Sequence, residues 1–444
     1  MVDAQILVRD TGVFLHKRCP EHGWHEALVS SDVDWYLNSA KYNKPGAVPL
    51  DLATSVVQGC PYDCGICPEH QQHTCLGLIE VTTRCNLECP TCFADAGKGY
   101  DLSLEQVEFI LDRFIESEGR PEIVQFSGGE PTIHPRLLEM IAAASKRNIR
   151  HVMVNTNGLR LAQDADFVRL LAECEPTIYL QFDGLTTVVY ERLRGFDLLD
   201  AKKKALDNLA EAGLYAILVA TIAKGTNDGE LGDILRFALD HPAVLGVCYQ
   251  PVTFAGRNCH PPDPVKRITV PDVLHLLEKQ TDGLFQVSDF RPVPCPHPDC
   301  SACSYAFIDH GKVIPITRII DVDDYLDFAV NRTSLDLSEE LRSALEALWG
   351  MASVMGTEKT TGALTCAACS IDLGELDLKE LRGQCFMVQV HGFMDEYNFD
   401  IKRLMKCCVH QLLPDGRAVP FCAYNCLGYR QQVGLEQEHA IGRR

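Results

Sequence analysis

The middle of the chain alternates strand-like and helix-like stretches six times, and this alternation limits the possible folds more than any other feature. Short apolar runs indicate buried strands, and apolar residues at three- and four-residue spacing indicate amphipathic helices. The expected strands span residues 78–82, 122–126, 151–154, 177–182, 215–222 and 244–250, and the expected helices span 104–114, 135–147, 164–173, 200–212, 228–240 and 271–280. A capping box from Ser103 to Gln106 precedes the first helix.

Strands that alternate with helices favour one parallel sheet, so the expected fold class is α/β. Six units fit either a partial (β/α)6 TIM barrel or an open doubly wound sheet, and we expect the barrel. Both architectures gather functional residues at the carboxyl ends of the strands. We place the barrel at residues 77–284, between an amino-terminal cysteine-rich region, 1–76, and a carboxyl-terminal one, 285–444.

The two flanking regions do not show this alternation. The first 75 residues look irregular. In the carboxyl-terminal region we expect a helix over residues 335–350 and a hairpin turn at Pro414-Asp415-Gly416-Arg417. Because cysteines concentrate in both regions, we expect each of them to form a cluster-binding extension of the barrel.

The chain has 444 residues, 21 cysteines and a formal net charge of −20. Such a chain lacks the basic surface that nucleic acid binding needs. It also has no general attraction to anionic lipid, although transient contact with a membrane surface stays open. No apolar run approaches the roughly 18–20 residues that span a bilayer, and the amino-terminal sequence has no apolar signal core. These features predict a cytoplasmic protein with reduced cysteines.

Three cysteines follow the first expected barrel strand with gaps of three and two residues: Cys85, Cys89 and Cys92. Three thiolates at this spacing can ligate three irons of a [4Fe–4S] cluster from one loop. The fourth iron is then left open, as catalysis requires. A zinc knuckle, or an ordinary cluster with a distant fourth cysteine, fits the same spacing. We call residues 83–97 the three-cysteine loop.

The segment Ser127-Gly128-Gly129-Glu130-Pro131 follows the second expected strand. Glycines at a strand end allow a ligand to approach the backbone closely, and Glu130 can accept hydrogen bonds from an ammonium group. With the three-cysteine loop one unit earlier, this segment resembles the radical S-adenosylmethionine (SAM) superfamily. The resemblance implies that the CxxxCxxC loop binds the catalytic cluster and that the GGE segment binds the amino group of SAM.

Polar residues at other strand ends fit the same resemblance. In the superfamily these places contact the ribose, the carboxylate or the substrate, and an aromatic residue after the last cysteine lies near the adenine. The corresponding residues here are Asn155, Asn157, Gln181, Asp183, Thr221 and Phe93. Asn-Gly and Asp-Gly are also common turn formers, so a purely structural role is the alternative at several of these positions.

Accessory cysteines lie on both sides of the expected barrel. Before it, Cys60, Cys64, Cys67 and Cys75 form a complete set of four ligands, for an iron–sulfur cluster or for zinc. After it, Cys295, Cys300 and Cys303 supply three ligands, and Cys408 or Cys422 is the expected fourth. The segment around these last cysteines looks like the extensions of several radical SAM families, which implies one or two auxiliary [4Fe–4S] clusters.

Three further cysteines have different surroundings. Cys19-Pro-Glu-His-Gly23 resembles the second knuckle of a rubredoxin or zinc ribbon, whose first CxxC pair is absent here. Cys174 and Cys248 fall in an expected helix and strand, and we expect them to be buried in the core, since a free cysteine packs as a small hydrophobe.

The order of these motifs resembles, over nearly the whole chain, the family of archaeal tetraether synthase and its bacterial homologues, some of which are proposed to methylate pterin carbons. The resemblance implies that a 5′-deoxyadenosyl radical takes hydrogen from an unactivated carbon, with a ferredoxin or flavodoxin as electron donor. Our first hypothesis is carbon–carbon coupling on an apolar, lipid-like substrate. The second is methylation of a pterin-like or other small molecule. The third is a non-catalytic electron carrier or iron–sulfur sensor.

Overall fold

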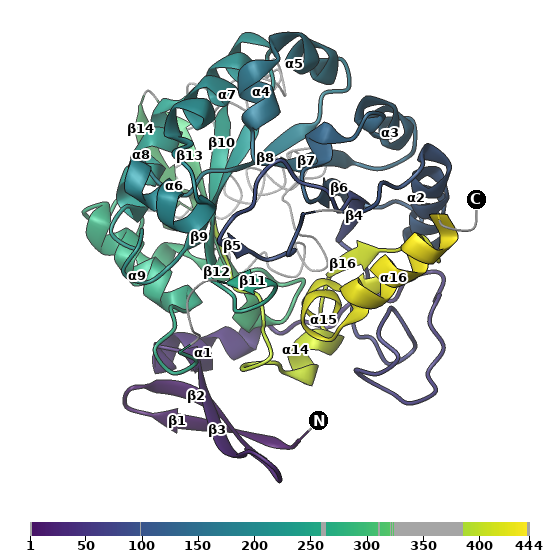
Figure 1. The fold of residues 1–444 in the computed structure, drawn as a ribbon. Helices are drawn as coiled ribbons and strands as arrows, with labels where there is room; N and C mark the ends of the chain where they lie inside the picture. The colour runs from purple at the N-terminus through teal and green to yellow at the C-terminus, as the bar shows by residue number, and fades with distance from the viewer. Residues whose placement is uncertain are drawn as a thin grey trace, which may run out of the picture.

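The computed structural model describes residues 2–97, 99–258, 263–309, 311–319, 321, 323 and 385–441. Its largest sheet has six central parallel strands, which pair in their order along the chain (Figure 1). They are β4 (Leu76–Thr82), β6 (Ile123–Gly128), β7 (His151–Thr156), β8 (Thr177–Gln181), β9 (Ala216–Ile222) and β10 (Val244–Pro251). The α/β class is confirmed. The doubly wound alternative is wrong, because that fold needs a reversal of strand order.

A helix follows each of these strands, and Figure 1 shows the helices on the outer side of the curved sheet. All six expected helices are present: α2 (Leu104–Glu118), α3 (Leu137–Ser145), α5 (Ala165–Ala172), α7 (Leu199–Glu211), α8 (Leu231–Asp240) and α9 (Val270–Gln280). The carboxyl ends of the strands therefore meet at one edge of the sheet, where the loops that lead into these helices lie.

Helix α2 illustrates why these segments fold as the pattern predicts. The N–H of Gln106 donates to Ser103 Oγ (3.2 Å), and the N–H of Ser103 donates to Gln106 Oε1 (2.9 Å), which completes the capping box. Val107, Ile110 and Phe114 are buried in the main core together with side chains of β4. Each such burial contributes roughly 1.5–3 kcal/mol, so packing outweighs helix propensity here.

Two short helices were not expected. Helix α4 (Leu159–Gln163) follows β7, and helix α6 (Thr187–Arg194) follows β8. Neither exceeds eight residues, so periodicity over a longer window does not reveal them. Helix α6 buries Tyr190 and Arg194, and it is important for the site described below.

The carboxyl-terminal region adds strands to both edges of the central sheet. At one edge β15 (Cys385–His391) pairs parallel with β10 and antiparallel with β13 (Ser301–Asp309), which also pairs with β12 (Arg291–Pro292) and β14 (Lys312–Pro315). At the other edge β16 (Val409–Leu412) pairs parallel with β4. Strand β16 forms a hairpin with β17 (Ala418–Pro420), which confirms the expected turn. Helices α14 (Ile401–Met405), α15 (Phe421–Cys426) and α16 (Tyr429–Ile441) complete this region.

We expected the amino-terminal region to be irregular, but it contains regular structure. Strands β1 (Ala4–Arg9), β2 (Gly12–Cys19) and β3 (Gly23–Ser30) form an antiparallel sheet, followed by helix α1 (Val33–Ser39). The alternation of apolar and polar side chains that reveals a half-buried strand is weak here, because β1 is almost wholly exposed. The expected helix over 335–350 lies outside the described residues. Within the described ranges, no helix combines the length and apolar character needed to cross a membrane.

Candidate active site at the carboxyl ends of the strands

The three-cysteine loop leaves the carboxyl end of β4 and is braced from the other side of the site. Strand β5 (Thr91–Cys92) pairs with β11 (Arg257–Asn258), which places Arg257 opposite Cys92. The Arg257 guanidinium donates to the carbonyls of Cys89 and Ala96, at 2.9 Å each. The loop therefore has a fixed course although it contains little regular structure.

The three thiols share one partly buried environment. Cys89 is buried, and Cys85 and Cys92 pack at the edge of the same small apolar cluster. Burial, together with the nearby Glu130, Cys89 and Cys92, raises the pKa of Cys85 to about 12. Thiols in such surroundings become thiolates when a cation binds them and offsets the cost of burying the charge. This donor set therefore suits a metal cluster.

The two glycines of the GGE segment lie against the start of the three-cysteine loop. A Cβ at Gly128 would stand 2.0 Å from the Thr82 carbonyl oxygen, and one at Gly129 would stand 2.2 Å from that of Arg84. Gly128 also has a φ of +136°, which disfavours other residues. The Gly129 N–H donates to Thr82 (2.8 Å) and the Glu130 N–H to Arg84 (2.9 Å). Only glycine allows the two segments to come this close.

Glu130 is buried, and its carboxylate is already engaged within the protein. Oε1 accepts hydrogen bonds from Thr132 N (3.0 Å), Thr132 Oγ1 (2.6 Å) and Thr156 Oγ1 (2.7 Å), and Oε2 accepts one from Asn157 N (2.7 Å). The carboxylate thus ties the loop after β6 to the end of β7.

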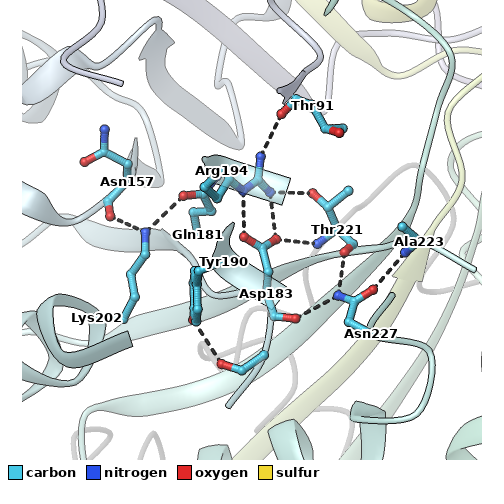
Figure 2. Close-up of polar contacts among 11 residues, drawn as sticks. Thr91, Asn157, Gln181, Asp183, Tyr190, Arg194, Lys202, Thr221, Ala223 and Asn227 are labelled. Atoms are coloured by element: carbon cyan, nitrogen blue, oxygen red, sulfur yellow. Dashed lines mark hydrogen bonds and ion pairs between the residues drawn. The ribbon is translucent and has the colours of Figure 1, made fainter. Parts of the chain in front are cut away.

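Asp183, expected to contact a ligand, forms a buried ion pair with Arg194 of α6 (Figure 2). Arg194 Nε and Nη2 each donate to the Asp183 carboxylate at 2.7 Å. The same guanidinium donates to the Thr91 carbonyl (3.0 Å) and to Thr221 Oγ1 (2.9 Å), and the Thr221 N–H donates to Asp183 (3.0 Å). Asp183 and Thr221 therefore hold Arg194 against the three-cysteine loop.

Arg194 was not among the expected site residues. Burial acts to lower its pKa, but Asp183 and the nearby Cys89 and Cys92 outweigh burial and raise it. A permanent positive charge thus lies close to two of the three thiols. The sequence offers one signal for this residue, an arginine directly before Gly195. Ordinary helix ends also have a basic residue in the last turn, so the signal does not single Arg194 out.

Lys202 of α7 is a second buried cation that the sequence did not single out. It is 0% exposed, and its Nζ donates to Gln181 Oε1 (3.0 Å) and to the Asn157 carbonyl, as Figure 2 shows. Burial lowers its pKa from 10.5 to about 8. Two expected site residues, Gln181 and Asn157, therefore contact Lys202 at the ends of β8 and β7.

The remaining expected residues lie at the carboxyl ends of the strands or in the loop after β4. Asn155 Nδ2 donates to Ser127 Oγ at 3.3 Å, which joins the ends of β7 and β6. Phe93 stacks on Phe421 of α15, with ring centroids 5.1 Å apart and planes at 5°, and it also contacts Phe393 (5.4 Å). We call Phe93, Phe393 and Phe421 the aromatic cluster. Its last two members come from the carboxyl-terminal region.

Comparison with known proteins identifies the family to which this chain belongs. The sequence profile of the Radical SAM superfamily matches residues 79–238, and that of the HMPTM N-terminal zinc ribbon domain matches residues 1–31. The 7,8-dihydro-6-hydroxymethylpterin dimethyltransferase of Methanocaldococcus jannaschii is 36% identical over 469 residues, which covers 97% of this chain and 92% of that protein. The chain belongs to the radical SAM superfamily.

Other similarities are more local. The mycofactocin maturase MftC of Mycobacterium tuberculosis is 29% identical over 170 residues, or 38% of this chain and 42% of MftC. The solved structure of Streptococcus suis SuiB bound to its precursor peptide SuiA has a TM-score of 0.40 and 18% identity, over 48% of this chain and 46% of SuiB.

The protein is thus a radical SAM enzyme and not a non-catalytic carrier. Membership of the superfamily implies a [4Fe–4S] cluster and SAM, and the residues described above fit both. Three clustered thiols suit the cluster, and a glycine-lined strand end beside them lets a small ligand approach the backbone. The profile match spans these features and also contains Arg194 and Lys202.

In this radical SAM chain, the accessory cysteines form other groups than those we expected from the sequence. Cys60, Cys64 and Cys67 line one pocket together with Leu404 and Pro420 of the carboxyl-terminal region. Cys75 does not join them. It forms a disulfide with Cys295 in the structure, and both are buried in one cluster with Cys408. Spacing along the chain groups Cys75 with those three, whereas in the structure it lies where the chain enters β4, beside β16.

The cysteines of the carboxyl-terminal region do come together. Burial, together with the nearby Cys300, raises the pKa of Cys422 to about 12. Burial and Cys300 also raise the pKa of Cys408. Cys303 packs at the edge of the Cys75 cluster. Both cysteines that we considered as a fourth ligand, Cys408 and Cys422, therefore lie near Cys300.

Three further cysteines were considered from the sequence. Cys248 is fully buried, as expected, and Cys174 is half-buried against the main core. Cys19 lies at the end of β2, inside the matched zinc-ribbon segment, with its Sγ 3.3 Å from His22 Nδ1.

Proposed function

We propose that this radical SAM enzyme methylates a reduced pterin or a closely related small heterocycle. The observation that supports this best is the similarity to the M. jannaschii pterin dimethyltransferase along almost the full length of both chains. Our first hypothesis, coupling of carbons on a lipid-like substrate, finds no comparable support among the relatives described above. The second hypothesis, methylation of a pterin-like molecule, is the one these relatives favour.

The sequence and the site together support specific roles for the residues. We infer that Cys85, Cys89 and Cys92 ligate the catalytic [4Fe–4S] cluster and leave one iron for SAM. When bound, the cluster and SAM supply a 5′-deoxyadenosyl radical that takes hydrogen from a carbon of the substrate. Gly128 and Gly129 present backbone groups to the SAM amino group, while Glu130, Asp183 and Arg194 hold the surrounding loops in place.

The aromatic cluster supports a planar substrate or cofactor ring near the catalytic loop. Flat aromatic side chains bind flat heterocycles by offset stacking, at ring separations of about 4.5–7 Å. Phe93 follows Cys92 directly, so a ring stacked in this cluster lies beside the proposed cluster ligands. A lipid tail has no such requirement for stacked rings.

Other parts of the molecule carry proposals that go with this function. The sequential strand order supports a partial (β/α)6 barrel, formed by residues 77–284 with cluster-binding regions on either side. We infer that the accessory cysteines hold one or more auxiliary metal centres. A ferredoxin or flavodoxin is the expected electron donor, and the cytoplasm the expected location.

The test is an anaerobic turnover assay with SAM whose methyl group carries an isotope label, a reductant and a 7,8-dihydropterin. Methylation predicts both 5′-deoxyadenosine and S-adenosylhomocysteine, with the label in the pterin product. 5′-Deoxyadenosine alone, with a coupled product from a lipid-like substrate and no labelled pterin, would overturn the proposal in favour of carbon–carbon coupling. A Cys89→Ala variant serves as the control and should lose SAM cleavage.

A further inference from the structure

A second group of ligand atoms lies away from the three-cysteine loop, where residues 72–75 enter β4. His73 Nε2 stands 3.4 Å from Cys75 Sγ, and the ligand atoms of His73, Cys75 and Cys295 all lie within 4.8 Å of one another. Cys75 and Cys295 are fully buried, and His73 is half-buried. Three donors from two distant segments thus converge on one buried point.

The other ring nitrogen of His73 has a carboxylate partner. His73 Nδ1 lies 2.9 Å from Glu118 Oε2, and Glu118 Oε1 accepts the N–H of Thr74 at 3.0 Å. Glu118 ends helix α2, and its side chain is only 4% exposed. A carboxylate on one ring nitrogen fixes the tautomer that leaves the other nitrogen as a lone-pair donor. Metal-binding histidines very commonly have this second partner.

The backbone at Cys75 and Cys295 is spaced for a shared ion. The structure brings the two sulfurs into contact as a disulfide, but the Cα atoms are 7.8 Å apart. Disulfides usually span about 4.4–6.8 Å between Cα atoms. Two thiolates on one metal ion stand farther apart than two bonded sulfurs, so the wider spacing suits them. Gln72 Nε2 donates to the Cys295 carbonyl (2.7 Å) and holds this segment.

We propose that His73, Cys75 and Cys295 bind one tetrahedral zinc ion, with Cys408 as the fourth ligand and Glu118 orienting His73. Cys408 is 0% exposed and packs in the same buried cluster as the other two cysteines. Its carbonyl accepts the N–H of Cys75 (3.0 Å) and that of Leu76 (3.1 Å), which fixes its backbone beside the site. The site joins residue 75, residue 295 and the start of β16. Zinc binding here does not depend on which substrate the enzyme takes.

The donor set and its spacing favour a single ion over an iron–sulfur cluster. Three thiolates and one imidazole form a common structural zinc site. With zinc–sulfur and zinc–nitrogen bonds of about 2.3 and 2.0 Å, a tetrahedron separates nitrogen from sulfur by about 3.5 Å. The observed separation of 3.4 Å between His73 and Cys75 agrees, and the bonded sulfurs of Cys75 and Cys295 move apart when they bind an ion. Ligands of a cubane bind different irons and stand farther apart.

Loading the site requires Cys75 and Cys295 as thiolates. If the pair is oxidised, a dithiol reductant supplies the two electrons and two protons that convert the disulfide into two thiols, and is itself oxidised to a disulfide. Zinc then displaces the thiol protons to solvent. The experiment therefore starts from full-length protein purified anaerobically with dithiothreitol.

The experiment measures zinc, iron and acid-labile sulfide per chain, with X-ray absorption at the zinc edge. All variants carry Cys19→Ser, so that the segment matched by the zinc ribbon profile does not add to the zinc count. His73→Ala and Cys295→Ser should each lose about one zinc and leave iron and sulfide unchanged. Cys174→Ser and His439→Ala are matched controls and should keep the zinc. The absorption spectrum should show three sulfur neighbours and one nitrogen.

Two results would overturn the proposal. One is zinc content that stays the same in both His73→Ala and Cys295→Ser. The other is a joint loss of iron and sulfide, which would place an iron–sulfur cluster here. Glu118→Gln preserves the size of the side chain and keeps the test decisive if the other variants misfold. It should weaken zinc binding 10- to 100-fold in a chelator competition, and unchanged binding would contradict the role of Glu118.

Discussion

At the scale of single residues, close backbone contact around the three-cysteine loop depends on side chains being absent. Gly129 is the sharpest case, because a Cβ there would meet the Arg84 carbonyl. Buried charge is the other theme at this scale. Arg194 and Lys202 both lie in the interior beside proposed cofactor ligands, and each is held by neighbouring oxygen atoms. Two variants test these features.

Gly129→Ala should strongly reduce SAM cleavage. Its Cβ would stand 2.2 Å from the Arg84 oxygen, so the GGE segment and the three-cysteine loop must separate. Such overpacking typically costs about 1–3 kcal/mol, and we expect at least a tenfold loss of 5′-deoxyadenosine formation. Gly97→Ala is the matched control in the same loop, because a Cβ there meets nothing within 4 Å. Equal activity of the two variants would contradict the argument.

Lys202→Met should remove a pH dependence of stability. Burial lowers the pKa of Lys202 from 10.5 to about 8, so the unfolded chain holds a proton that the folded chain has lost between these values. Folding stability due to Lys202 therefore rises as pH increases from about 8 to 10.5, and is lowest below 8. Replacement by Met should thus stabilise more at pH 7 than at pH 10, by roughly 2–3 kcal/mol. Urea unfolding of the apoprotein measures this difference.

The control for Lys202 is its neighbour. Lys203 is exposed on the same helix, and Lys203→Met should change stability equally at both pH values. A Lys202→Met effect that does not vary with pH would show that the ammonium group is not destabilised by burial.

At the scale of elements, helix α6 connects the end of β8 to the three-cysteine loop. Its Arg194 reaches Asp183, Thr221 and the carbonyl of Thr91, which precedes Cys92. The short helix thus places one planar guanidinium among three separate segments. Lysine has a single ammonium group and cannot match this geometry.

Arg194→Lys should destabilise the protein and weaken retention of the catalytic cluster. Breaking a buried charge pair costs about 3–5 kcal/mol, and a lysine restores only part of the contact. Iron content after gel filtration and the midpoint of thermal unfolding measure the effect. Arg192→Lys, on the exposed face of the same helix, should leave both values unchanged. If the two variants behave alike, Arg194 does not brace the loop.

At the scale of the whole molecule, the carboxyl-terminal region joins both edges of the central sheet. Strand β15 continues the sheet beyond β10, and β16 continues it beyond β4. The same region contributes Phe393 and Phe421 to the aromatic cluster and packs Cys422 and Cys408 against cysteines of the amino-terminal region. Its helices are anchored on β4 by Glu80, which pairs with Arg430 (2.5 Å) and accepts from Tyr424 (3.0 Å).

Glu80→Gln should loosen this anchoring. Glu80 and Arg430 are both buried to a large degree, and removing one charge leaves the other without compensation, at a cost of about 3–5 kcal/mol. Hydrogen exchange should show faster exchange of amides in α15 and α16, and thermal unfolding should occur at a lower temperature. Glu436→Gln, an exposed change on α16, should do neither. Unchanged amide exchange in Glu80→Gln would contradict the anchoring role of Glu80.

The sequence by itself predicted the six strands, the six main helices and the place of the three-cysteine loop and GGE segment. These features are local: periodicity, a capping box and ligand spacing each need only a short stretch of chain. The function was less determined, because the motifs identify the cofactor chemistry and say little about the substrate. Relatives, rather than motifs, moved the proposal from lipid coupling to pterin methylation.

Only the tertiary structure decided which distant segments meet. It placed Cys75 with Cys295 and Cys408 instead of with Cys60, Cys64 and Cys67, and it revealed Arg194 and Lys202 as buried cations. It also added β15 and β16 to opposite edges of one sheet. These outcomes depend on free energies of packing and pairing between segments up to hundreds of residues apart. A linear pattern does not record them, because either partner alone resembles an ordinary cysteine, helix end or strand.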